Sequence, residues 1–235
     1  MKTTSAFYSV LLVGLLCILI FSCSKQGTIK TIPIVSVSVV TNITASSASA
    51  GGMVSADGGS TVTSRGVCWS TSQPPSTSNS KTSDGTGTGS FTSSIAGLSP
   101  GTTYYLMAYA INSLGTGYSS QSTFTTSALP PVITTAAITT ITSTSASSGG
   151  TITSNGGSTI TASGVCWSTN QNPGITDNKT TDGSATGSYT SSITGLTGGT
   201  NYYVRAYATN KAGTAYGNQL TFTTAQDLPP APPVW

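Results

Sequence analysis

The amino-acid sequence contains one long internal repeat. Residues 33–126 align with residues 131–224 without a gap. About half of the aligned positions are identical, and a repeat of this kind constrains the fold before any other feature. A copy of about 95 residues is long enough to be an independent domain, whereas solenoids have periods of about 20–50 residues. The repeat therefore predicts two similar domains in series, at residues 33–127 and 131–226.

Each copy consists of short segments separated by turn residues. Clusters of Gly, Asn, Ser and Pro interrupt the sequence at short spacing, and no segment shows a helical period. Thr, Val, Ile and Tyr, which favour strands, lie between these clusters, and only 6% of all residues are charged. We expect about six or seven short strands in each copy. The predicted fold class is all-β, with each copy a sandwich of two sheets.

The most regular strand occurs at Leu98–Asn112 and again at Leu196–Asn210. In both copies a glycine turn is followed by residues that alternate between two faces. The simplest role of the outward face is a cross-strand ladder that covers the sheet, and a partner or glycan face is the alternative. In the second copy the predicted inward residues are Tyr202, Val204, Ala206 and Ala208. The predicted outward residues of the two copies are Tyr105, Tyr109, Tyr203, Arg205 and Tyr207.

The start of this strand resembles the corner between strands E and F of fibronectin type III domains. The matching residues are Leu98, Pro100-Gly101-Thr102 and Tyr104, and the second copy matches them apart from a glycine in place of the proline. The resemblance covers both repeats and implies two tandem immunoglobulin-like sandwiches. In such a corner, the hydroxyls of Tyr104 and Tyr202 would hydrogen-bond to the backbone a few residues upstream. The family's second-strand Trp is absent, which leaves a related immunoglobulin-like sandwich as an open alternative.

The third strand carries a Cys-Trp pair in each copy, Cys68-Trp69 and Cys166-Trp167. Strict alternation from the preceding apolar residue would place the Cys inward, whereas a bulge at the intervening glycine would place the Trp inward. We favour an inward Trp, because an exposed Trp is costly and the resemblance calls for a large core residue here. The alternative for the Trp is an exposed platform for sugar stacking. Each Cys is interpreted as a small buried residue, since the two lie a domain apart and cannot form a disulfide.

A Lys-Thr-x-Asp-Gly motif recurs at residues 81–85 and 179–183. A calcium ion usually takes six to eight oxygen ligands, several of them carboxylates, and the motif supplies one Asp per copy. We therefore interpret Asp84 and Asp182 as parts of β-turns, and we predict neither a metal nor a cofactor.

The N-terminal residues have the pattern of an export signal. Lys2 precedes the apolar run Val10–Phe21, which is shorter than the roughly 20 residues that span a bilayer. The run ends at Ile20-Phe21-Ser22-Cys23, which resembles a bacterial lipobox. The resemblance implies a signal peptide at 1–22, acylation of Cys23 (palmitate), a tether to residue 32 and, because Ser24 follows, the outer membrane. A soluble secreted protein cut nearby and an uncleaved anchor are the alternatives.

Composition restricts the function further. The chain has no His and no Glu, so acid–base catalysis has few candidate residues, and we predict a protein that is not an enzyme. The net charge of +3 comes from isolated cations, which argues against nucleic-acid binding. We expect a monomeric surface lipoprotein whose domains act as spacers or adhesion-type interaction modules. Glycan binding is the alternative. The Pro-rich tail at 227–235 predicts a stiff segment, and the chain could be part of a longer protein.

Overall fold

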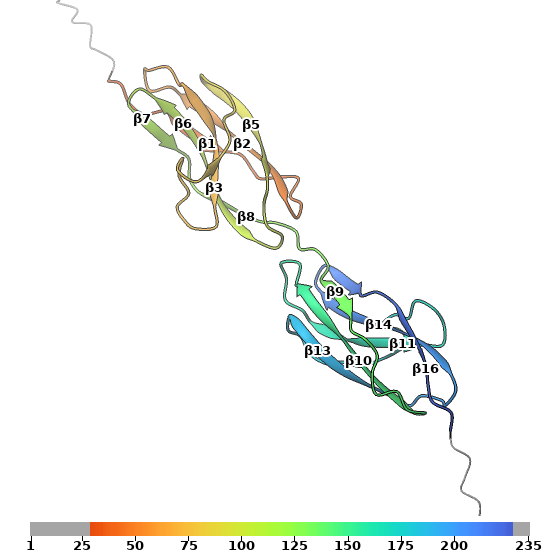
Figure 1. Cartoon of the computed structure of the whole chain (residues 1–235). Helices are drawn as coiled ribbons and strands as arrows, with labels where there is room; N and C mark the ends of the chain where they lie inside the picture. Colours follow the sequence, from red (N-terminus) through yellow and green to blue (C-terminus); the bar gives the residue numbers. More distant parts are fainter. Residues whose placement is uncertain (1–28, 228–235) are drawn as a thin grey trace, which may run out of the picture.

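The computed structural model describes residues 29–227 as two β-sandwiches joined end to end (Figure 1). We call residues 33–127 domain 1 and residues 131–226 domain 2. The predicted signal peptide, Cys23 and most of the predicted tether lie outside the described residues, as does the tail beyond Asp227. In the described part of the chain, no helix is long and apolar enough to cross a membrane.

Each domain contains eight strands, against the six or seven expected from the sequence. Those of domain 1 are β1 (Ile34–Val37), β2 (Ser47–Ala56), β3 (Ser64–Ser70), β4 (Ser80–Lys81), β5 (Gly89–Ala96), β6 (Thr103–Asn112), β7 (Gly115–Tyr118) and β8 (Ser122–Thr125). Those of domain 2 are β9 (Val132–Thr135), β10 (Ser145–Ser154), β11 (Ala162–Ser168), β12 (Asn178–Lys179), β13 (Gly187–Thr194), β14 (Asn201–Asn210), β15 (Gly213–Tyr216) and β16 (Leu220–Thr223).

The sheet order identifies the kind of sandwich. In domain 1, one sheet has the order β1-β2-β5 and the other has the order β4-β3-β6-β7, with β8 also paired to β6. Domain 2 repeats both sheets. An immunoglobulin constant-type domain places its fourth strand beside the fifth, in the sheet of the first two strands. Here the fourth strand pairs with the third, in the other sheet. The fold is therefore fibronectin type III-like, as predicted, and its strand order differs from that of an immunoglobulin constant-type domain.

The core of each domain lies between its two sheets. Alternate residues of the long strands supply it, with Val54, Ile95 and Leu106 among the most buried side chains of domain 1. The central strands β6 and β14 carry the pattern expected from the sequence. The four residues predicted to face inward on β14 (Tyr202, Val204, Ala206 and Ala208) are all buried.

The corner before β6 has the predicted hydrogen bond. The backbone N–H of Ser99 donates to the hydroxyl of Tyr104 at 3.0 Å, and Thr197 donates to Tyr202 at 3.1 Å. The ring of Tyr104 also stacks on Phe124, with 5.7 Å between ring centroids. The corner therefore fixes the start of β6 to the last strand of its own domain.

Candidate functional site

The outer face of β6 and β14 carries the residues named for the alternative of a partner or glycan face, and much of it is covered. Tyr109 is 1% exposed and Tyr207 is 2% exposed, so the prediction that both face outward into solvent is wrong. The Tyr109 hydroxyl donates to the carbonyl of Thr82 at 2.6 Å, and the Tyr207 hydroxyl donates to that of Thr180 at 2.7 Å. Both tyrosines therefore hold the segment that crosses above them.

A glycine explains why this segment lies so close. Gly66 on β3 pairs with Tyr109 on β6, and a Cβ atom at Gly66 would lie only 2.6 Å from the carbonyl oxygen of Thr82. The chain after β4 thus packs directly on the backbone of β3 and covers the neighbouring tyrosine. Alternation along a single strand does not predict this cover, because the covering residues come from another part of the sequence.

The other three residues of the predicted face are half-buried. The guanidinium of Arg205 lies 4.6 Å from the ring centroid of Tyr216, and its Nε donates to the carbonyl of Gly217 at 3.2 Å. Arg205 therefore contributes to packing within its own sheet. Tyr105 and Tyr203, one in each domain, are the tyrosines of this face that keep part of their surface accessible.

The Cys-Trp pairs have the favoured orientation. Trp69 and Trp167 pack against the cores of their domains, and the ladder from β3 to β6 runs without a register shift. The inward Trp therefore needs no bulge at Gly66, because the change of phase occurs before β3 begins. Trp167 is only 8% exposed, so it offers no platform for a sugar, whereas Trp69 is half-buried.

Cys68 and Cys166 are free and buried on the opposite side of the strand from the tryptophans. The thiol of Cys166 donates to the carbonyl of Pro173 at 3.3 Å, within the loop that covers this side of β11. Desolvation by burial is the main cause that raises the pKa of each thiol to about 11. Both thiols are therefore protonated at neutral pH and are poor nucleophiles in the folded domains.

The two Lys-Thr-x-Asp-Gly motifs are not β-turns. In domain 1 the motif continues from β4 without a turn, and the Asp84 carboxylate accepts hydrogen bonds from the hydroxyls of Thr82 at 2.6 Å and Ser93 at 2.5 Å. Ser93 lies on β5 in the opposite sheet, so the carboxylate ties the two sheets together at this edge. Asp182 makes the same two contacts in domain 2, with Thr180 and Ser191.

The sequence alone does not reveal this link, because the serine that completes it lies on a strand of the opposite sheet. The available signal was the recurrence of both the Thr-x-Asp motif and the serine at equivalent positions of the two copies. Among residues 29–227, no group of three or more His, Cys, Asp or Glu side chains is placed to hold a metal ion.

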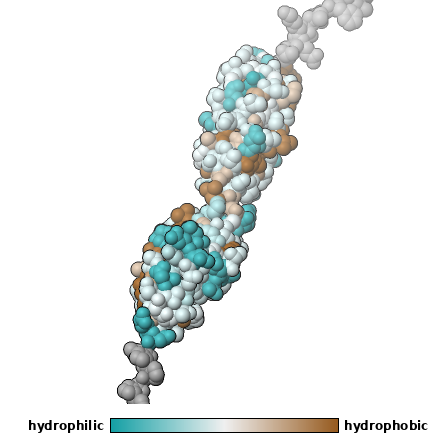
Figure 2. Space-filling view, turned by 90° about the vertical axis from the view of Figure 1, so that its right-hand side faces the viewer, coloured by the Kyte–Doolittle hydropathy of each residue, from teal (hydrophilic) through white to brown (hydrophobic). Residues whose placement is uncertain are grey.

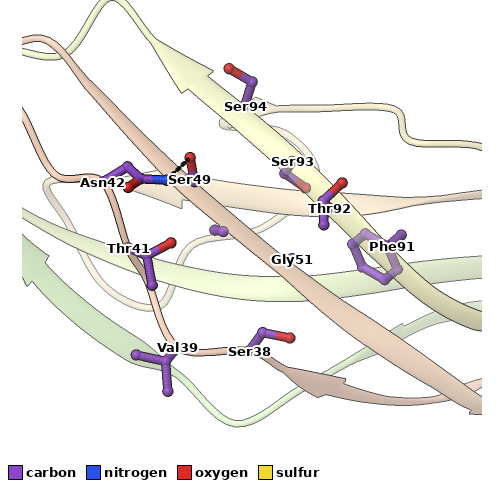
Figure 3. A pocket seen from close by; sticks show the side chains of 11 residues that line it. Ser38, Val39, Thr41, Asn42, Ser49, Gly51, Phe91, Thr92, Ser93 and Ser94 are labelled. Atoms are coloured by element: carbon purple, nitrogen blue, oxygen red, sulfur yellow. Dashed lines mark hydrogen bonds between the residues drawn. The ribbon is translucent and has the colours of Figure 1, made fainter.

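A hollow of about 450 Å³ lies over β2 and β5 in domain 1 (Figure 3). Gly51 is part of its lining, together with the hydroxyl-bearing residues Ser49, Thr92 and Ser94. The Asn42 amide donates to the Ser49 hydroxyl at 3.3 Å across one side. The side chains that line the hollow are neutral, so it offers hydrogen bonds but neither an ion pair nor a catalytic acid or base.

A second hollow, of about 270 Å³, lies beside Trp69 in domain 1. Its lining includes Asn79 and Thr71, together with part of Tyr104. An aromatic ring beside amide and hydroxyl groups is an arrangement that can bind a sugar. It is the feature of the described residues that best fits the glycan alternative.

The remaining surface is unusually neutral. Figure 2 shows a face that is mostly pale, the colour of residues of intermediate hydropathy such as Ser, Thr and Gly, with hydrophilic residues gathered over part of domain 2 and smaller brown areas. On this face the hydrophobic areas are small, so it offers no broad apolar patch to a partner.

The comparisons with known proteins include a solved structure of tandem domains. The crystal structure of the chicken CNTN1 FN1–FN3 domains is similar to this chain, with a TM-score of 0.45 and 16% sequence identity. The similarity covers 83% of this chain and 67% of that one. No protein-family model and no curated protein matches the sequence. The assignment of the fold therefore rests on the strand order described above.

Proposed function

We propose that this protein is a non-catalytic surface lipoprotein whose two sandwiches act as a spacer and as protein-interaction modules. Its acyl anchor is Cys23, its tether leads into domain 1, and its site of action is the bacterial outer membrane. Acyl chains on one Cys bind a bilayer stably when there are two or more of them.

The observation that carries the proposal is the path of the chain. The described chain enters domain 1 at one end of the structure and leaves domain 2 at the opposite end (Figure 1). Each domain therefore adds its length to the distance between the two ends. The burial of Tyr109 and Tyr207 supports the same proposal, because these two of the five residues of the alternative binding face stabilise the fold instead.

Metabolic labelling with a clickable fatty acid tests the anchor. The full chain expressed in a Gram-negative host should be labelled and should fractionate with membranes. Cys23→Ser should lose the label and leave the membrane fraction, whereas the control Cys17→Ser, within the apolar run, should keep both properties. A label retained by Cys23→Ser would contradict the proposed anchor.

Glycan binding is the second candidate, and the hollow beside Trp69 is the observation that favours it. A glycan array compares the wild type with Asn79→Ala, which changes the hollow, and with Tyr203→Ala, which changes the accessible outer face. Binding that either substitution abolishes would establish the site. The absence of binding to any sugar would reject this candidate and leave the spacer role.

A further inference from the structure

Hydrogen bonds hold the chain to domain 1 as far as Ser127, its last residue before the linker. The backbone N–H of Ser127 donates to the carbonyl of Thr44 at 3.0 Å, and the N–H of Gly101 donates to the carbonyl of Ser127 at 3.1 Å. Thr44 precedes β2 and Gly101 belongs to the corner before β6, so Ser127 is held by both sheets of domain 1.

Domain 2 fastens the linker again two residues later. The N–H of Leu129 donates to the carbonyl of Gly156 at 2.8 Å. The side chain of Asn210, at the end of β14, donates to the carbonyls of Leu129 at 2.8 Å and Asn155 at 2.7 Å. Ala128 is thus the one residue between the two fastened positions.

The backbones of the two domains also touch beside this residue. A Cβ atom at Gly157 would lie 2.2 Å from the carbonyl oxygen of Pro100, and a Cβ atom at Gly101 would lie 1.8 Å from the carbonyl oxygen of Gly157. Both glycines have positive φ, of +81° and +59°. Only glycine combines this backbone conformation with so close an approach.

We infer that the linker is a one-residue joint that holds the two domains at a fixed angle, with Gly101, Gly157 and Asn210 as its positioning residues. This inference deepens the proposed function, because it makes the spacer a rod of defined reach instead of two freely rotating domains. Short linkers that are pinned on both sides leave few torsions free, and the contact between the glycines limits those that remain.

The chain contains a matched control for this joint. Asp57-Gly58-Gly59 in domain 1 is equivalent to Asn155-Gly156-Gly157, and Asn112 donates to the carbonyls of Thr31 and Asp57 as Asn210 does in domain 2. Gly59 has a φ of +76°, but the nearest atom to an added Cβ would be Lys30 Cγ at 3.6 Å. Substitution of Gly59 therefore creates the same local strain without a neighbouring domain.

Distances between spin labels on the intact chain test the inference. The labels are placed by Ser94→Cys and Ser192→Cys, at equivalent exposed positions of the two domains, while Cys68 and Cys166, the native thiols of the described residues, are buried. We expect one narrow distance distribution for this chain and for Gly59→Ala. We expect Gly157→Ala to shift or broaden it, and an insertion of two glycines after Ala128 to broaden it strongly.

Two results would contradict the inference of a one-residue joint. One is a broad distribution before any change to the linker. The other is a distribution that neither Gly157→Ala nor the insertion alters, with circular dichroism showing that both variants are folded. If Gly157→Ala unfolds domain 2, the two-glycine insertion alone tests the inference, because it leaves the hydrogen-bonded residues on both sides of Ala128 unchanged. Loss of the lipid anchor would refute the proposed membrane attachment but would leave these distances unchanged.

Discussion

In domain 1, the guanidinium of Arg65 lies 5.5 Å from the ring centroid of Phe91 and donates to the carbonyls of Gly87, Thr88 and Gly89. This contact fixes the loop that leads into β5. The Nε atom of Arg65 is buried without a hydrogen-bond partner among the described residues, so the arrangement is not fully satisfied.

In domain 2, the equivalent residues are Ser163 and Tyr189. The Tyr189 hydroxyl donates to the carbonyl of Gly164 at 2.6 Å, and the Ser163 hydroxyl donates to that of Gly183 at 3.0 Å. The two changes are coordinated, because the domain that lacks the arginine has gained a hydroxyl on the facing ring. The same sheet-to-sheet contact is thus made by a cation in one copy and by a phenol in the other.

A second difference between the domains concerns one backbone amide of the central strand. The N–H of Ala108 on β6 donates to the hydroxyl of Ser119 at 2.9 Å. The equivalent N–H of Ala206 on β14 donates to the hydroxyl of Thr135 on β9 at 3.0 Å, and Gly217 replaces the serine. The comparison teaches that the fold requires a hydroxyl at this amide but not a particular strand to supply it.

The largest expected difference between the copies concerns their tryptophans. Trp167→Ala should destabilise domain 2 by about 3–5 kcal/mol, as for other large core truncations. Trp69→Ala should cost domain 1 less, because Trp69 is half-buried and borders a hollow. Alkylation of Cys68 and Cys166 during urea unfolding, read by mass spectrometry, reports each domain separately. Equal losses would contradict the difference in burial.

Arg65→Ser should destabilise domain 1 by about 2 kcal/mol, because three carbonyls lose a charged donor. The double variant with Phe91→Tyr gives domain 1 the pair found in domain 2 and should recover part of this loss. Urea unfolding followed by the alkylation of Cys68 measures the stability of both variants. If the double variant is no more stable than Arg65→Ser, the two pairs are not equivalent solutions.

Ser119→Ala in domain 1 and Thr135→Val in domain 2 should have similar effects, of about 1–2 kcal/mol each, since both leave a buried backbone amide without its acceptor. Thr134→Val, at an exposed neighbouring position on β9, is the control and should change little. Hydrogen exchange at the amides of Ala108 and Ala206 would show whether protection is lost at these positions. A variant that keeps full protection at its amide would show that the hydroxyl is dispensable.

Domain 2 should be the more sensitive domain in alkaline solution. Burial is the main cause that raises the pKa of Tyr189, and Phe91 is its counterpart in domain 1. Above pH 10 the unfolded Tyr189 ionises while the folded one stays protonated, so stability falls by about 1.4 kcal/mol per pH unit. Cys68 and Cys166 lower the stability of their domains equally between pH 9 and about 11, because both pKa values are raised alike. Tyr189→Phe should remove the difference between the domains, and an unchanged difference in pH-dependent unfolding would contradict this assignment.

The smallest effect is expected from Arg205→Met, which introduces the residue that domain 1 carries at this position, Met107. Loss of the contact with Tyr216 and of the bond to Gly217 should cost about 0.5–1 kcal/mol. Thermal unfolding with Lys211→Met as the control, at an exposed cation, would measure it. A loss as large as that of Arg65→Ser would mean that the two cations are equally important.

The sequence predicts the repeat, the sandwich and the corner tyrosines, because each follows from a local pattern or from the offset between the copies. It also predicts the inward Trp. It fails at Tyr109 and Asp84, where a residue's surroundings come from a segment distant in sequence. The one-residue joint was equally out of reach, because most of the groups that hold it are backbone groups and the Asn210 side chain lies 81 residues from Leu129 in the sequence.

The measurement that tests the spacer most directly is neutron reflectometry of the lipidated protein on a supported bilayer. We expect a protein layer as thick as two domains in line, standing off the bilayer surface. A two-glycine insertion after Ala128 should make this layer thinner and more diffuse. A layer only one domain thick for the unmodified protein, or protein that does not remain on the bilayer, would contradict the proposed role.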